Sequence, residues 1–220
     1  FKATLGGLTG VIRGRVLPAP PLSEDFEGFD LTENSLTDDG VKFAYPPLPW
    51  IGARFKWEVR ERDGSKVLAK TLDRLLFQRA MTFIGHPHST NYTMTADVMT
   101  DGNRRVMSTV GLVHQRYIIA LKGNWQQLEV SSNHDRLKVA VPFEWKANTW
   151  FTMKTRVDVD EGGAGVIRAK AWMRGTEEPT DWTIEVPHAR AHKQGAPGLF
   201  GFSPQSQKRV YVDNISVTPN

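Results

Sequence analysis

The sequence contains no cysteine among its 220 residues. Disulfide bonds, thiolate metal sites and cysteine nucleophiles are therefore excluded. No apolar run approaches the ~18 residues that a membrane-spanning helix needs, so no membrane span is expected. The chain begins at Phe1 and lacks the basic start and apolar core of a signal peptide. We therefore expect it to be a piece of a longer polypeptide.

A strong charge imbalance is also missing. The chain has 28 Lys and Arg against 24 Asp and Glu, a formal net charge of +4, without blocks of like charge. This small excess favours acidic partners. Basic strands that carry aromatic residues could mimic a groove for single-stranded nucleic acid, but the charge is too low, so no nucleic acid partner is expected.

Turn dipeptides divide the chain into short segments in which apolar and polar residues alternate. Between residues 151 and 157, Phe151, Met153 and Val157 alternate with polar side chains. The alternation predicts strands over 54–60, 92–100, 105–114, 117–122, 125–132, 137–143, 150–157, 166–173, 182–186, 199–202 and 210–217. Only 71–78 has a weak helical pattern. The expected fold is all-β, an antiparallel two-sheet jelly-roll sandwich.

The first 22 residues differ from the rest because they are rich in glycine and then in proline. This composition predicts an N-terminal arm or linker over residues 1–22, coming from a preceding domain, and a sandwich domain over 23–220. The preceding domain of the same polypeptide is an expected partner.

Three stretches carry a family resemblance: residues 23–28, 91–97, and 197–202 with 210–217. They resemble the concanavalin A-like lectin/glucanase superfamily, especially laminin-G-like modules at the C-terminus of secreted bacterial proteins with quinoprotein-type β-propeller repeats. The resemblance implies a jelly roll and a secreted, periplasmic or cell-surface location. It leaves the activity open, because the superfamily includes lectins, carbohydrate-binding modules, glycoside hydrolases and lyases.

The resemblance also implies a structural Ca²⁺ where the first and last strands meet, with Glu27 and Asp213 as side-chain ligands. Calcium prefers six to eight hard oxygens, and Asp25 lies close to Glu27 in the sequence. In the alternative interpretation, Asp213 ends a strand pairing and Glu27 is solvated.

Candidates for glycan binding lie where the strand pattern turns a tryptophan and polar side chains away from the core. They are Trp125, Gln127 and Glu129; Trp150, Lys154 and Arg156; Arg168, Lys170 and Trp172; with His114 and Arg116 at a strand end. A pyranose stacks its apolar face on an aromatic ring and offers hydroxyls to polar groups, and Arg favours uronate or sulfate. Alternatively, these residues are the solvated sides of strands.

Enzymatic patterns are weaker. The Glu-x-Asp-x-x-Glu arrangement of jelly-roll glucanases is absent, and no catalytic residue is assigned. His114, Arg116 and Tyr117 are residue types that a lyase could use. His188 and His192 have a zinc-like spacing, but Pro187 and a loop-like context disfavour zinc. We predict a non-catalytic module that binds a poly- or oligosaccharide. A hydrolase or lyase and a structural or interaction domain are the alternatives.

Overall fold

The computed structural model describes residues 1–31, 42–72, 78–203 and 208–220, which form strands and no helix. One sheet has six strands: β6 (Arg79–Phe83), β10 (Thr109–His114), β11 (Tyr117–Lys122), β12 (Gln127–Ser132), β13 (Leu137–Pro142) and β17 (Gly198–Phe202). Its order is β13-β12-β11-β10-β17-β6, and every neighbouring pair is antiparallel.

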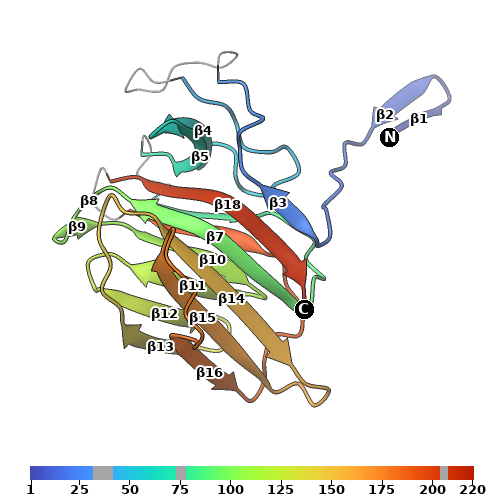
Figure 1. Cartoon of the computed structure of the whole chain (residues 1–220). Helices are drawn as coiled ribbons and strands as arrows, with labels where there is room; N and C mark the ends of the chain where they lie inside the picture. Colours follow the sequence, from blue (N-terminus) through green and yellow to red (C-terminus); the bar gives the residue numbers. More distant parts are fainter. Residues whose placement is uncertain (32–41, 73–77, 204–207) are drawn as a thin grey trace.

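The second sheet has eight strands: β3 (Leu22–Glu24), β4 (Trp57–Arg62), β5 (Ser65–Lys70), β7 (Tyr92–Thr100), β14 (Phe151–Val159), β15 (Gly165–Met173), β16 (Ile184–His188) and β18 (Val210–Pro219). Its order is β16-β15-β14-β7-β18-β5-β4, with β3 added to β18. The two sheets lie face to face (Figure 1). The structure therefore confirms the predicted all-β sandwich, and the described residues contain no helix that could span a bilayer.

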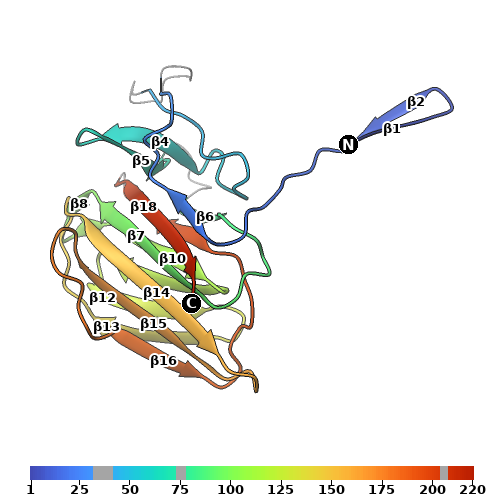
Figure 2. The same cartoon turned by 45° about the vertical axis from the view of Figure 1, so that its right-hand side comes forward.

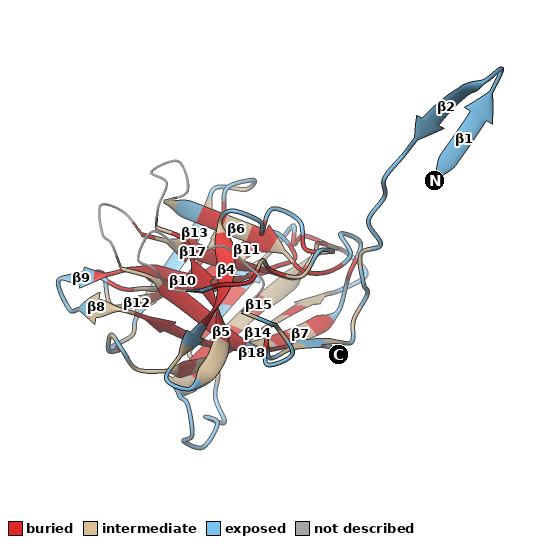
Figure 3. Cartoon of the chain, turned by 90° about the horizontal axis from the view of Figure 1, so that it is seen from above, coloured by how far each residue is buried: buried red, intermediate tan, exposed pale blue. Residues whose placement is uncertain are grey.

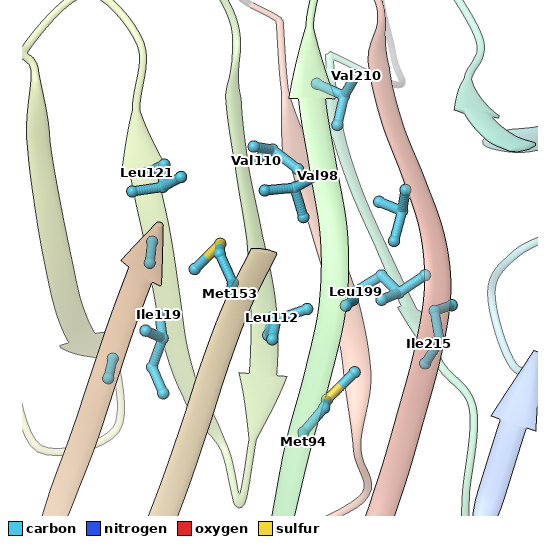
Figure 4. Close-up of a cluster of buried hydrophobic side chains, with 14 of the residues drawn as sticks. Met94, Val98, Val110, Leu112, Ile119, Leu121, Met153, Leu199, Val210 and Ile215 are labelled. Atoms are coloured by element: carbon cyan, nitrogen blue, oxygen red, sulfur yellow. The ribbon is translucent and has the colours of Figure 1, made fainter. Parts of the chain in front are cut away.

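The core fills the space between the sheets, where the inward-facing side chains of both sheets meet. Leu112 and Ile119 from the six-stranded sheet meet Val98 and Met153 from the other sheet (Figure 4). Phe151, Met153 and Val157 are buried as the alternation predicts. Buried residues accordingly gather inside the sandwich and exposed ones in its loops (Figure 3).

Three local predictions need correction or fall outside the described residues. A strand was expected over residues 54–60, but Phe55 lies before β4 with φ 70° and is 51% exposed. Trp125 was expected in a strand, but it lies in a turn where Gln126 has φ 51°, so β12 begins at Gln127. The helical candidate 71–78 lies mainly outside the described residues.

An N-terminal hairpin stands apart from the sandwich (Figure 2). It consists of β1 (Lys2–Leu5) and β2 (Leu8–Val11), and its apolar side chains are exposed. The following segment contacts the sandwich where Arg15 donates to the Trp50 carbonyl at 3.2 Å and His86 N–H donates to the Pro18 carbonyl at 2.9 Å.

Strand β18 contains a bulge between Asp213 and Ser216. Before it, Asp213 pairs with Asp97 of β7, and after it Ser216 pairs with Thr95, so one extra residue is present in β18. On its other side, β18 pairs with β5 before the bulge and with β3 after it. Asn214 in the bulge has φ 48°.

Candidate functional site

The sandwich has two ends that differ in chemistry. We call one the tryptophan end, formed by residues 102–107, 123–126 and 143–151 with Met173, including the small hairpin of β8 (Gly102–Asn103) and β9 (Val106–Met107). The opposite end contains the β10–β11 and β12–β13 turns and residues 188–195. We call this the histidine end.

A pocket of about 500 Å³ lies at the tryptophan end. Its lining combines apolar and polar residues: Gly102, Asn103, Arg104, Met107, Gln126, Glu144, Trp145, Lys146, Ala147, Thr149, Phe151 and Met173. Trp145 is fixed in place because its backbone N–H donates to Gln126 Oε1 at 3.0 Å and its indole N–H donates to the Lys122 carbonyl at 3.4 Å. The pocket therefore has a rigid aromatic wall.

The rim of this pocket carries charged side chains. Arg104, Glu144 and Lys146 are exposed and form no ion pair with the described residues. Trp125, one residue before the pocket residue Gln126, is 72% exposed. The turn that removes Trp125 from β12 thus places its ring in solvent.

The outer face of the eight-stranded sheet holds the predicted residues of β14 and β15. Lys154 and Lys170 both pair with Glu178, at 2.9 and 2.7 Å, and these hydrogen bonds, that of Lys170 first, lower the pKa of Glu178. Arg156 and Arg168 share Asp158, and Arg168 also pairs with Glu185; Trp172 beside them is partly buried. The basic residues of this face are therefore neutralised within the chain.

Trp150 lies next to a cluster of carboxylates on the same face. The Arg174 guanidinium sits 4.7 Å from the centre of the Trp150 ring and 3.6 and 3.9 Å from oxygens of Asp97 and Asp213. Burial, followed by the nearby Asp97 and Glu27 carboxylates, raises the pKa of Asp213 to about 6. This cluster would accommodate a further positive charge.

The calcium implied by the family resemblance would bind here. Asp213 and Glu27 are near enough to interact, but Glu27 Oε1 already accepts a hydrogen bond from the Lys66 N–H at 3.0 Å. Within the described ranges, these carboxylates do not form a tight set of three donor atoms. Calcium bound by Glu27 and Asp213 stays a prediction.

The remaining predicted residues lie elsewhere. Gln127 and Glu129 are on the outer face of the six-stranded sheet, and Glu129 is 7% exposed between Lys122 at 3.5 Å and Lys138 at 3.6 Å. Because the two outer faces point in opposite directions, the predicted residues do not form one surface. Alternation along a strand shows that a side chain leaves the core but not which sheet carries it, so the candidate residues divide between two faces.

His114 also needs correction, because it was expected beside a surface groove and is 0% exposed. Its ring stacks on Tyr92 with centroids 4.0 Å apart, and its Nδ1 lies 2.9 Å from Thr155 Oγ1. Complete burial lowers the pKa of His114 to about 3, so the imidazole is neutral at physiological pH. Neighbouring Arg116 is exposed in a turn with φ 72°.

The histidine end assembles residues that are distant in sequence. The Tyr117 hydroxyl lies 2.7 Å from His188 Nδ1 and accepts the His192 backbone N–H at 3.1 Å. His192 Nε2 is 2.9 Å from Ser132 Oγ and 3.3 Å from Asp135 Oδ2. Burial lowers the pKa of His192, whereas a hydrogen bond with His134 lowers that of Asp135. Neither Asp135 nor His134 stands out in the sequence as a site residue.

Comparison with known proteins supports the fold. No family model matches the chain and no curated protein matches its sequence. Among solved structures, the carbohydrate-binding module CBM66 from Bacillus subtilis aligns with a TM-score of 0.52 at 13% identity, covering 77% of this chain and 94% of that one. The marine PL-14 alginate lyase from Aplysia kurodai aligns with a TM-score of 0.53 at 9% identity, covering 78% and 89%.

A mutant alginate lyase in complex with an alginate tetrasaccharide aligns with a TM-score of 0.52 at 10% identity, covering 93% of this chain and 98% of that one. Identities this low establish the architecture and leave the activity open. The chain is a jelly-roll β-sandwich of the concanavalin A-like type. The laminin-G-like subtype stays a prediction.

Proposed function

We propose that this chain is a non-catalytic glycan-binding module and that it binds sugar in the pocket at the tryptophan end. The observation that carries the proposal is a pocket of about 500 Å³ whose charged rim groups form no ion pair with the described residues, with Trp125, 72% exposed, directly before the pocket residue Gln126. Ligand sites in proteins are typically concave and mostly apolar, with a few polar groups that fix orientation.

The chemistry of the pocket suits a sugar ring. Met173, which is 50% exposed, offers apolar surface for the face of a pyranose, and Asn103 and Thr149 offer polar groups for its hydroxyls, above a floor of buried Trp145, Phe151 and Met107. Trp125 provides a second surface for stacking beside the pocket. A chain of linked sugars could therefore contact both places.

The rim favours an acidic glycan. Arg104 and Lys146 add two positive charges against the one negative charge of Glu144. Guanidinium and ammonium groups form charge-assisted hydrogen bonds with carboxylate or sulfate. We therefore expect polyuronates to bind more tightly than neutral glucans.

Binding is favoured over turnover because the tyrosine–histidine pairs are not accessible. Tyr117 lies 2.7 Å from His188, as a lyase acid–base pair would, but its side chain is 0% exposed. Tyr92, stacked on His114, is equally buried. A catalytic group must contact the sugar ring, so a lyase reaction would require the histidine end to open. From the family resemblance, we also propose that the chain is an accessory module of a larger bacterial protein that is exported.

Affinity measurements test the proposal. Isothermal titration with oligomers of alginate, polygalacturonate and laminarin should show binding of the acidic oligomers, which weakens as salt increases. Trp125→Ala should reduce affinity about fivefold, because an aromatic contact contributes roughly 1 kcal/mol. Arg104→Ala with Lys146→Ala should remove the preference for acidic oligomers.

Leu48→Ala serves as the matched control, because Leu48 is a large apolar residue that is 74% exposed and outside the pocket. The affinity of the Leu48→Ala variant for the acidic oligomers should equal that of the wild type. Assays for reducing ends and unsaturated uronates should stay negative. Turnover would establish the enzyme alternative instead, and absence of both binding and turnover would favour a structural or interaction domain.

A further inference from the structure

The histidine end holds a set of metal-binding side chains that the glycan pocket does not use. His134, Asp135 and His192 each offer one ligand atom, and these atoms all lie within 4.8 Å of one another. It is the one such group found in the part of the chain that the structure describes. The group links the β12–β13 turn to the loop that follows β16.

The two oxygens of Asp135 face three imidazole rings. Oδ1 lies 3.1 Å from His134 Nδ1, and Oδ2 lies 3.3 Å from His192 Nε2. His188 Nε2 lies 4.0 Å from the same Oδ2. Small side-chain movements would bring these four groups around one ion.

A second observation points to a ligand at this place. Asp135 Oδ2 is buried and forms no hydrogen bond within the described structure. Buried polar atoms in folded proteins nearly always have a hydrogen-bond partner, so an exception needs an explanation. A cation shared with the neighbouring imidazole nitrogens would satisfy this oxygen directly.

The surrounding contacts hold His188 in an orientation suited to a ligand. Tyr117 engages its Nδ1 at 2.7 Å, which leaves Nε2 directed toward Asp135. Histidines that bind metals usually have their other ring nitrogen held in this way. His192 Nε2 contacts Ser132 Oγ at 2.9 Å, and this hydrogen bond must be exchanged for the metal bond.

We propose that His134, Asp135, His188 and His192 bind a zinc ion. Three imidazoles and one carboxylate, without thiolates, match the ligand preference and tetrahedral coordination of zinc. Calcium would require six to eight oxygens. The His134 side chain is 70% exposed, so the ion can enter from solvent. The ion would join the edge strands β13 and β16, which belong to different sheets.

Titration of the EDTA-treated chain with zinc chloride tests the site. One zinc ion should bind per chain and raise the melting temperature. Calcium chloride should not change the melting temperature of the Asp213→Asn variant, which lacks a ligand of the implied calcium site. Asp135→Asn and His134→Ala should each weaken zinc binding at least about tenfold. Tyr117→Phe should weaken it less, because Tyr117 is not a ligand and only positions His188 and the backbone of His192.

The matched control is the double variant His86→Ala with His88→Ala. These two histidines pack edge to face with ring centroids 5.2 Å apart at a separate exposed position, so their removal should leave zinc affinity unchanged. Circular dichroism without zinc checks that every variant is folded, and exposed His134 is the safest substitution in this respect. Zinc binding that survives Asp135→Asn, that disappears in the control, or that is absent from the wild type would overturn the proposal.

Discussion

At the tryptophan end, Arg104, Glu144 and Lys146 are exposed and form no ion pair with the described residues, whereas at the histidine end Asp135, His188 and His192 contact one another. The first arrangement leaves charges free for a ligand from outside. The second directs donor atoms toward a common centre only a few ångströms wide. The same sandwich therefore offers an open site for a large ligand and a closed one suited to a single ion.

The largest expected effect is a loss of folding stability in acid, caused by buried His114 at the histidine end. Because the pKa of His114 is about 3 in the folded chain and 6.5 is its ordinary value, the unfolded chain takes up a proton first as the pH falls. The stability from neutral His114 is complete above pH 6.5 and should decrease by roughly 4 kcal/mol by about pH 3. Urea unfolding at several pH values measures this loss.

The double variant His114→Leu with Thr155→Val removes both partners of the buried hydrogen bond and should flatten this pH dependence. His86→Gln, which removes an exposed histidine, should keep the wild-type profile. An unchanged slope in the double variant would assign the acid sensitivity to other groups.

The next effect separates structure from binding at the tryptophan end. Trp145 is 3% exposed and packs on Phe151, so Trp145→Ala should destabilise the chain by roughly 3–5 kcal/mol. Trp125→Ala should change the free energy of unfolding by less than about 0.5 kcal/mol. Chemical denaturation of both variants measures the difference, and a large loss for Trp125→Ala would contradict its placement in solvent.

The smallest effect concerns the acidic cluster beside the tryptophan end. Because the pKa of Asp213 is raised from 3.8 to about 6, its contribution to stability is complete below pH 3.8 and is lost as the pH rises through 6. Asp213→Asn should therefore stabilise the calcium-free chain by about 1 kcal/mol at pH 7.5. Thermal melts in EDTA measure this gain.

The same melts with added calcium test the implied ligand set. If Glu27 and Asp213 hold calcium, the ion should raise the melting temperature of the wild type and have little effect on Asp213→Asn. A calcium effect of equal size in both would place the ion elsewhere.

Strand alternation carried most of the fold prediction. Residues 92–100 and 117–122 were predicted as strands with the bounds that β7 and β11 have. Tyr92, Met94 and Ala96 alternate with polar residues in the first stretch, and the apolar run of the second ends at the Gly123-Asn124 turn. The prediction for Trp125 was wrong because it depends on one left-handed backbone conformation, at Gln126, which alternation does not encode.

The histidine end was harder to predict from the sequence. His188 and His192 are visible as a pair, but Asp135 lies more than fifty residues earlier and reaches them only because edge strands β13 and β16 come together. The pocket at the tryptophan end was not predicted either, because the candidates Trp125 and Trp150 lie at this end but neither lines the pocket. The sequence also does not reveal which charges are paired. Glu178 and Glu185 lie outside the strands that were predicted to carry the basic residues with which they pair.

The bulge in β18 makes Asn214 a residue that the alternation of the strand does not need. With Asn214 deleted, Ile215 would oppose Ala96 and every later side chain would keep its present face. What the sheet would lose is the Asn214 amide, which donates to Asp97 Oδ2 at 2.9 Å, and part of the lining of a small pocket beside β3. The single added residue thus gives β18 a polar group at its surface and leaves the side chains that face the core in place.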